Sequence, residues 1–195
     1  MKELNILAIS GSLRNQSSNT LLMHAMIKLA HTNLKFEVYD GLNGLPHFNP
    51  DLDVEEGPVS VQNLRGQLKH SDGVLICTPE YGNGVPGVLK NVLDWVVSSG
   101  EWLNKPTIAI AASPSPMGGD KAHASLLLTL NMINAQVLQE GCITIPHITL
   151  KMNKQGVIID SETQRALQNS LTILGEACNQ MKVYTDVVLK SMIEK

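Results

Sequence analysis

Apolar residues recur along the chain in five short runs. These runs occupy residues 4–9, 34–39, 74–77, 107–112 and 142–145, and each is flanked by Gly, Pro, Ser or Asp. Apolar runs of this length, bounded by turn-forming residues, are typical of buried β-strands. The pattern therefore predicts five strands.

The segments between and after these runs have the spacing of helices. Apolar residues recur every three or four positions over residues 22–29, 61–68, 88–96, 126–133 and 167–181. That spacing places them on one face of a helix. Strict alternation of strands and helices predicts a doubly wound α/β fold, with a parallel sheet covered by helices on both faces. Five strands favour the flavodoxin-like order 2-1-3-4-5, in which ligands bind at the carboxyl ends of strands one and three.

Length and composition narrow the possible classes of protein. The 195 residues suit one domain covering residues 1–195, and a net charge of −3 with dispersed Lys and Arg argues against nucleic-acid binding. No targeting pattern is visible and no window approaches the roughly 20 apolar residues of a membrane span, so we expect a cytoplasmic protein.

The three cysteines are far apart, and no His or Cys shows metal-ligand spacing. We expect reduced thiols and no metal site.

The loop after the first strand is rich in groups that bind anions. Seven of the eleven residues from 10 to 20 are Ser, Thr or Asn, and Arg14 lies among them. The N–H groups and dipole of a helix N-terminus favour an anion, and an arginine adds a two-pronged contact to phosphate oxygens. A helix start that is only capped by Ser or Asn is the alternative, but it leaves Arg14 without a role. We interpret the segment as a phosphate-binding loop.

Two further loops follow strands that end at the same edge of the predicted sheet. Residues 78–87 contain three glycines, which allow a ligand to approach the backbone closely, and Tyr81 offers an aromatic surface. This composition suits a flat ring, although a tight turn with Tyr81 as a lid is the alternative. Residues 113–120, with Gly118 and Gly119, lie after the fourth strand and fit either a ligand loop or a plain connection. Together the loops predict a mononucleotide site.

Other nucleotide and hydrolase motifs are absent. The sequence has no Gly-x-Gly-x-x-Gly after the first strand, no P-loop and no Gly-x-Ser-x-Gly elbow. A nucleophilic Ser12 would need a histidine base, and the sequence contexts of the histidines do not indicate one.

Residues 43–58 form the longest irregular stretch, which we interpret as an ordered surface loop, with a disordered linker as the alternative.

Two motifs resemble a known family. The pattern Gly-Ser-x-Arg-x-x-Ser-x-Asn begins at Gly11, and Thr-Pro-Glu-Tyr at residues 78–81 is followed by Pro-Gly-x-Leu-Lys-Asn at residues 86–91 and Asp-Trp at residues 94–95. In these motifs the chain resembles the NADPH-dependent FMN reductases, which include quinone, chromate and azo-dye reductases with a flavodoxin-like fold. The resemblance covers roughly residues 4 to 150.

The resemblance implies FMN as the bound cofactor and assigns residues to it. The residues that would hold the FMN phosphate are Ser12, Arg14, Ser17 and Asn19, with Thr20 beside them. Those that would line the ring and the ribityl chain are Pro79, Glu80, Tyr81, Ser113 and Gly118. Many members have Asn directly after the tyrosine and Ser two residues later, whereas this chain has Gly82, Asn83 and Gly84. A polar contact to the flavin is therefore either shifted to Asn83 or lost.

The resemblance also implies an activity. FMN would take a hydride from NADPH or NADH and pass the electrons to a quinone, free flavin or other small acceptor in a ping-pong cycle, with no catalytic acid or base from the protein. Members form homodimers or homotetramers, and Trp95 and Trp102 are either contacts between copies or core residues. The alternatives are a non-enzymatic flavodoxin-type electron carrier and an interaction domain that has lost its flavin.

Overall fold

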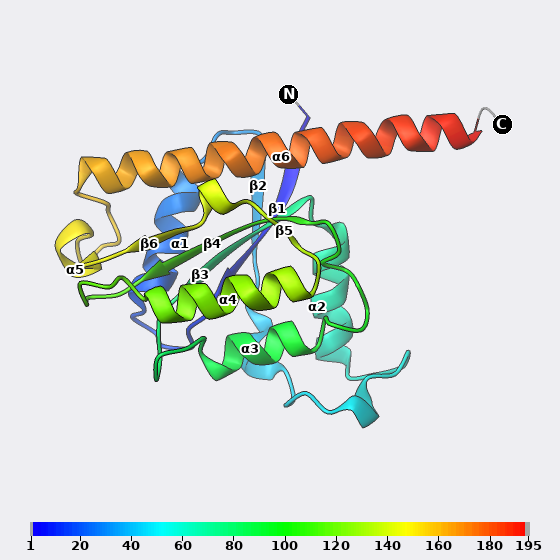
Figure 1. The fold of residues 1–195 in the computed structure, drawn as a ribbon, viewed down its shortest axis with the longest axis horizontal. Coiled ribbons are helices and arrows are strands. Elements are labelled where there is room, and N and C mark those ends of the chain that lie inside the picture. The colour runs from blue at the N-terminus through cyan, green and yellow to red at the C-terminus, as the bar shows by residue number, and fades with distance from the viewer. Residues whose placement is uncertain (1, 194–195) are drawn as a thin grey trace.

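The computed structural model describes residues 2–193, and their side chains as far as Tyr184. Its strands are β1 (Leu4–Ser10), β2 (Leu34–Val38), β3 (Gly73–Thr78), β4 (Pro106–Ala112), β5 (Gln136–Val137) and β6 (Ile143–Ile145). All of these strands pair in parallel, in the order β2-β1-β3-β4-β5, and β6 also pairs with β4 (Figure 1). The predicted parallel sheet and its strand order are confirmed.

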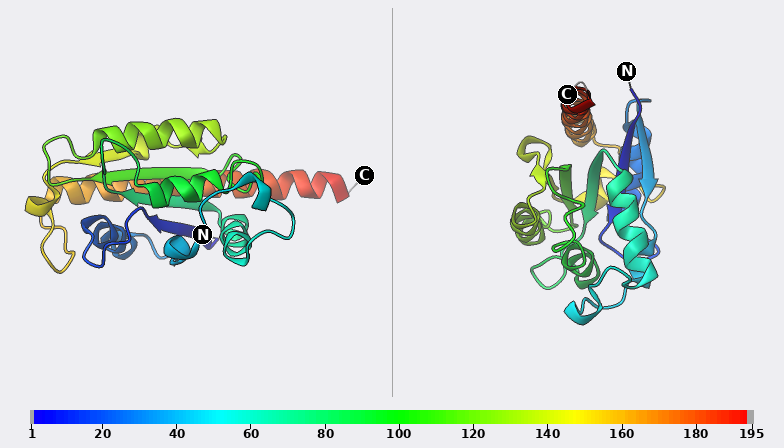
Figure 2. Two further views of the ribbon diagram at one scale, coloured as in Figure 1. Left: turned by 90° about the horizontal axis from the view of Figure 1, so that it is seen from below. Right: turned by 90° about the vertical axis from the view of Figure 1, so that its right-hand side faces the viewer.

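Helices cover both faces of the sheet (Figure 2). They are α1 (Ser18–Leu29), α2 (Val59–His70), α3 (Gly87–Asp94), α4 (Asp120–Met132), the short α5 (Ile148–Lys151) and the long α6 (Ser161–Ile193). On one face, Leu22 of α1 and Leu171 of α6 share a core with Ile6 of β1. On the other, Leu64 of α2 packs with Leu7, the next residue of β1. Both faces of β1 are therefore buried, which explains why its residues are almost all apolar.

No described helix has both the length and the apolar character needed to cross a bilayer.

The outer edge of β4 is shared by two short strands. The apolar run predicted at residues 142–145 corresponds to β6, which pairs with the end of β4, while β5 pairs with its beginning. Between them lies the 3₁₀ turn η3 (Gln139–Gly141), in which a Cβ on Gly141 would lie only 2.7 Å from Cγ2 of Ile108. The turn packs against β4 between the two paired segments, and the sheet has six strands rather than the five expected.

Residues 43–58 form an ordered surface loop, as the sequence predicted. The segment around it contains the 3₁₀ turns η1 (Gly41–Gly44) and η2 (Pro50–Leu52). The carbonyl of Pro46 accepts hydrogen bonds from Nε1 of Trp95 at 2.8 Å and from Nδ2 of Asn91 at 2.9 Å. The loop is therefore fastened to α3 and its C-terminal end.

Several residues that stand out in the sequence belong to the core. Trp95 and Trp102 are both 0% exposed, so they are core residues and the alternative of a contact between copies does not hold for them. Cys77 and Cys178 are free and buried, and burial raises the pKa of the Cys178 thiol to about 12. These thiols remain protonated and act as small apolar side chains.

Candidate functional site

The first loop leaves β1 in close contact with β3. The N–H of Gly11 donates to the carbonyl of Cys77 at 2.8 Å. A Cβ on Gly11 would lie 2.6 Å from Oγ1 of Thr78, so only glycine fits here without displacing that side chain. This contact places the loop against the carboxyl end of β3.

The loop then enters α1 through a capped N-terminus. Ser17 is the N-cap, and its hydroxyl accepts a hydrogen bond from the N–H of Thr20 at 3.4 Å. The first turn of α1 contains no acidic residue, and the exposed Arg14 lies just before it. The helix start is therefore capped by a serine, as the alternative interpretation of this loop expected, but the cap does not involve the guanidinium of Arg14. A positive side chain beside a helix N-terminus suits an anion.

Asn19 connects α1 to the end of β4. Its Nδ2 donates to the carbonyl of Ala112 at 2.9 Å, and its Oδ1 accepts from the N–H of the same residue at 3.2 Å. The side chain is only 3% exposed. A contact between Asn19 and a phosphate would therefore use its backbone N–H, because the side-chain amide already has partners. Thr20 is similarly engaged, since its hydroxyl lies 2.7 Å from that of Ser10.

The second loop contains a two-residue hairpin. Tyr81 and Gly84 exchange both backbone hydrogen bonds at 3.1 Å. The central residues Gly82 and Asn83 have φ values of 56° and 60°, as in a type I′ turn, which favours Gly and Asn at these positions. Within the described part of the chain, the N–H groups of Gly82 and Asn83 have no hydrogen-bond partner. They remain available to a ligand.

Tyr81 joins the first two loops. Its side chain is 54% exposed, and its hydroxyl lies 3.4 Å from the hydroxyl of Ser12. The hydroxyl of Ser12 also accepts a hydrogen bond from the N–H of Arg14 at 3.2 Å. The partners of Ser12 are therefore a tyrosine and a backbone amide, which is not the arrangement of a serine nucleophile with its base.

Glu80 caps a helix that lies far away in the sequence. Its Oε2 accepts hydrogen bonds from the N–H groups of Lys121 at 2.9 Å and Ala122 at 3.0 Å, in the first turn of α4. A carboxylate is favourable at a helix N-terminus because of the free N–H groups and the dipole. The side chain of Glu80 therefore holds the second loop against α4. The sequence carried no signal for this pairing.

The third loop is tied to β6. The N–H of Ser113 donates to the carbonyl of Ile145 at 3.2 Å, and its hydroxyl accepts from the N–H of Ser115 at 3.1 Å. Gly118 has a φ of 66°, and a Cβ there would lie 2.8 Å from the nitrogen of Pro146. Gly118 is therefore required for packing against the chain after β6.

The three loops enclose a pocket of about 130 Å³. Seven residues predicted from the sequence line it, namely Arg14, Ser17, Asn19, Pro79, Glu80, Tyr81 and Ser113. The prediction did not include three other lining residues, which are Ser18, Ala112 and Pro114. Ser18 could have been found from its place in the polar loop, whereas Ala112 and Pro114 carry no chemical signal. The remaining predicted residues lie outside this pocket, and they are Ser12, Thr20, Gly82, Asn83, Gly84 and Gly118.

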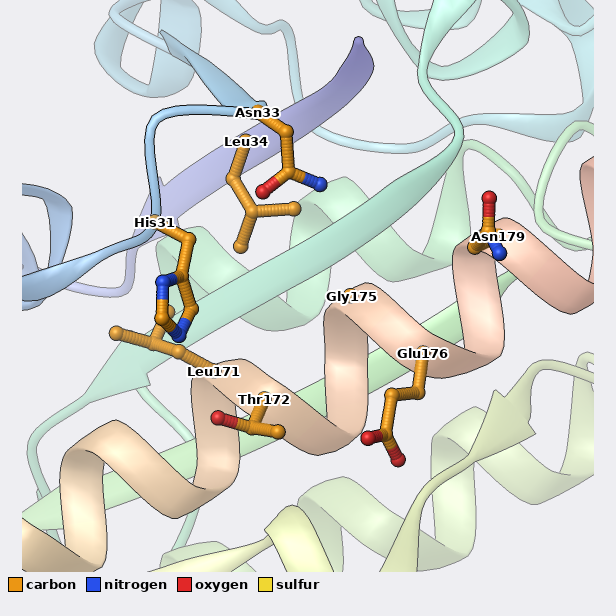
Figure 3. Close-up of a pocket in the computed structure, with 8 residues that line it drawn as sticks. All are labelled: His31, Asn33, Leu34, Leu171, Thr172, Gly175, Glu176 and Asn179. Atoms are coloured by element: carbon orange, nitrogen blue, oxygen red, sulfur yellow. The ribbon is translucent and has the colours of Figure 1, made fainter. Parts of the chain in front are cut away.

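Another pocket, of about 230 Å³, lies between α6 and the amino end of β2 (Figure 3). Leu34, Leu171 and Gly175 line it together with polar residues such as His31 and Glu176, and an added Cβ on Gly175 would lie 3.4 Å from Cδ2 of Leu34. It contains none of the predicted site residues and lies at the end of β2 opposite to the carboxyl edge of the sheet. Ligands of doubly wound folds bind at that carboxyl edge.

Comparisons with known proteins show the family of the chain. The family model described as NADPH-dependent FMN reductase matches residues 4–149. The chain belongs to this family. It is 30% identical over 186 residues to a quinone reductase of Escherichia coli K12, covering 93% of this chain and 99% of the relative. It is 32% identical over 168 residues to a 2-hydroxy-1,4-benzoquinone reductase of a Burkholderia species, covering 85% and 91%.

Among solved structures, the fold matches FerB, a flavoenzyme NAD(P)H:(acceptor) oxidoreductase from Paracoccus denitrificans. The TM-score is 0.79 at 30% identity, with 91% of this chain and 98% of FerB covered. The resemblance stated from the two sequence motifs is confirmed, and so is the flavodoxin-like fold. The chain is thus an oxidoreductase of the FMN reductase family, which uses FMN and NAD(P)H.

Proposed function

We propose that this enzyme binds FMN across the carboxyl ends of β1, β3 and β4 and reduces small quinones by a ping-pong mechanism. Bound FMN supplies the electron chemistry, because it can take a hydride from NAD(P)H and give both electrons to an acceptor. The observation that carries the proposal is the pocket in which Arg14 and Ser17 at the start of α1 meet Tyr81 and Ser113 from the neighbouring loops.

The phosphate end of FMN fits the residues at the start of α1. Arg14 has a free guanidinium within the described part of the chain, and Ser17 holds the first turn of the helix in place. The pocket of about 130 Å³ is smaller than the roughly 300 Å³ or more of typical ligand sites. It therefore suits the phosphate and part of the ribityl chain, and the flavin ring would lie beyond it, over the second loop.

The second loop offers groups for the ring. The hairpin from Tyr81 to Gly84 presents the unpaired N–H groups of Gly82 and Asn83, which can donate to ring carbonyls or nitrogens. The carboxylate of Glu80 accepts hydrogen bonds from N–H groups in the first turn of α4 and thereby holds this loop in position. None of these residues needs to move a proton, so we propose no catalytic acid or base.

An open ring face would allow NAD(P)H and the acceptor to bind in turn at one place. Tyr81 is more than half exposed, which leaves this side of the site open to solvent. Two relatives named above act on quinones, which are flat like the flavin ring, and we propose quinones as acceptors on that basis.

We also propose that the enzyme works as a homodimer or homotetramer in the cytoplasm, where free thiols such as Cys77 stay reduced.

Absorption spectroscopy tests the proposal directly. The protein is loaded with FMN, made anaerobic, and mixed first with NADPH and then with 1,4-benzoquinone. We expect the flavin absorbance to bleach with NADPH and to recover with the quinone. In steady-state assays, double-reciprocal plots of initial rate against NADPH concentration at several fixed quinone concentrations should give parallel lines. A flavin that binds but is not reduced by NADPH or NADH would instead indicate a flavodoxin-type carrier, and a chain that binds no FMN would refute the proposed site.

A further inference from the structure

The two edges of the sheet differ in how they are protected. One edge carries β5 and β6, which are only two and three residues long and pair with β4 on either side of η3. The other edge is β2, whose five residues pair with β1 without interruption. Figure 2 (right) shows β2 along the outer side of the molecule. Prolines and bulges commonly stop an edge strand from pairing with another chain, and β2 has neither.

The alternation of the strand determines which backbone groups of β2 face outward. The carbonyl of Asn33 accepts a hydrogen bond from β1, and the N–H of Tyr39 donates one to β1, both at 2.9 Å. Backbone groups of successive residues in a strand point to opposite sides. Leu34, Phe36 and Val38 therefore direct their N–H and C=O groups away from β1. Because β2 ends the sheet, the N–H groups of Phe36 and Val38 have no ladder partner among the described residues.

The sequence of β2 is complementary to itself in the antiparallel direction. The strand reads Leu-Lys-Phe-Glu-Val over Leu34–Val38, so apolar residues alternate with two residues of opposite charge. If Phe36 lies opposite the partner's Phe36, each Lys35 lies opposite the partner's Glu37. Registers centred on Lys35 or on Glu37 would instead place like charges opposite each other, which is unfavourable. The charges therefore favour the register centred on Phe36.

The hydrogen-bonding pattern agrees with this register. Phe36 and the partner's Phe36 would exchange two backbone hydrogen bonds, and the N–H of Val38 would donate to the carbonyl of the partner's Leu34. Lys35 and the partner's Glu37 would form a non-hydrogen-bonded pair, the arrangement in which opposite side chains lie closest. Opposite charges in such a pair stabilise the contact between two strands.

The side chains of β2 are free to make these contacts. Glu37 is exposed and forms no ion pair within the described residues. The side chain of Lys35 is 55% exposed and lies 3.5 Å from the exposed carboxylate of Glu3. An exposed ion pair of this kind contributes little and can exchange its partner. On the other face of the strand, Phe36 is half-buried and Val38 is 38% exposed, so both can pack against their counterparts.

We propose that β2 pairs antiparallel with β2 of a second copy of this chain, which joins two six-stranded sheets about a twofold axis. The pairing gives the proposed homo-oligomer a specific interface and rests on that part of the proposed function. It does not depend on the redox chemistry, because no residue of β2 lines the flavin pocket. One strand of five residues buries little area, so the association is weak, with a Kd of about 1 to 100 μM.

Sedimentation velocity of the FMN-loaded protein at about 5 to 500 μM tests the pairing through its charges. Lys35→Glu should weaken the association at least about tenfold, because it places two acidic residues opposite each other twice in the dimer. Adding Glu37→Lys to the same chain should restore it, since opposite charges then face each other again. Lys154→Glu, which makes the same charge change at an exposed position outside β2, should associate normally.

A second pair of variants tests the backbone hydrogen bonds. Val38→Pro removes an outward N–H, so it should reduce the association by one step, from dimer to monomer or from tetramer to dimer. Its melting temperature should change little, because this N–H forms no bond to β1. Val38→Thr keeps the N–H and the branched Cβ and should associate normally. Retained FMN binding shows that each variant is folded.

Two results would overturn the pairing. If Lys35→Glu and Val38→Pro both associated like the unaltered protein, another surface would join the copies. A protein that stays monomeric at about 500 μM would exclude both this pairing and the proposed homo-oligomer. Neither result bears on the reductase activity, which is tested separately by the reduction of bound FMN with NADPH.

Discussion

The side-chain amide of Asn19 forms two hydrogen bonds with the backbone of Ala112, across 93 positions of the sequence. Nδ2 donates to the carbonyl at 2.9 Å, and Oδ1 accepts from the N–H at 3.2 Å. The pair fastens the first turn of α1 to the end of β4, where the third loop begins. The family motif that contains Asn19 therefore has a structural component, in addition to any contact with a ligand.

Replacing Asn19 by Ala should destabilise the protein even without FMN. The change removes both partners of buried backbone groups, which should lower the free energy of unfolding by about 2 to 4 kcal/mol. Urea unfolding of the FMN-free protein measures the effect. Ser18→Ala, at the neighbouring position of the same helical turn, is the control and should change stability by no more than about 0.5 kcal/mol. Equal stability of Asn19→Ala and the unaltered protein would show that the amide matters only to the ligand.

Replacing Arg14 by Ala should weaken FMN binding without changing the stability of the FMN-free protein. The guanidinium is exposed and has no partner among the described residues, so its removal costs the fold little. A charge-assisted contact to phosphate contributes about 1.5 to 3 kcal/mol, or roughly ten- to a hundredfold in Kd. Quenching of FMN fluorescence measures the affinity. Lys28→Ala, which removes the same charge from the last turn of α1, should bind FMN normally. An unaltered Kd in Arg14→Ala would remove this residue from the phosphate site.

The sequence predicted those features that depend on local pattern. Apolar runs such as residues 4–9 identified the strands, and the carboxyl ends of parallel strands necessarily brought Arg14 and Tyr81 to one edge of the sheet. The sequence did not predict the partners of Asn19 and Glu80. A polar side chain reveals its capacity for hydrogen bonds, but its partner at a distance of 41 or 93 positions is set by how α1 and α4 pack. For the same reason β5, only two residues long, could not be recognised.

The turn at Gly82 and Asn83 allows the backbone role of Asn83 to be separated from its side-chain role. Asn83→Val should destabilise the protein by about 1 to 2 kcal/mol, because a β-branched residue is strained at a φ of 60°. Asn83→Gly keeps the positive φ and should leave the melting temperature nearly unchanged. We expect this glycine variant to bind FMN about two- to tenfold more weakly, as one hydrogen bond to the flavin is lost. Asn104→Gly, at another positive φ away from the site, is the control. An unchanged Kd for Asn83→Gly would mean that the side chain does not contact the flavin.

Asp53 should make a pH-dependent contribution to stability. Hydrogen bonds from the hydroxyl of Ser98 and from Arg65, whose Nη2 lies 2.6 Å from Oδ1, hold the pKa of this carboxyl below its ordinary value. Because the pKa of this carboxyl is lower in the folded protein than in the unfolded chain, the stabilisation is complete at pH values above the unfolded-state pKa of about 3.9. It is lost as the pH falls through the folded-state pKa. The difference in unfolding free energy between the unaltered protein and Asp53→Asn should therefore be constant from pH 6 to 8, at about 1.5 to 3 kcal/mol, and shrink below about pH 4. Urea unfolding across this range measures it, with the exposed Asp51→Asn as a control that should show no such change. A difference that grew on acidification would contradict the assignment, because it would require a carboxyl whose pKa is raised by folding.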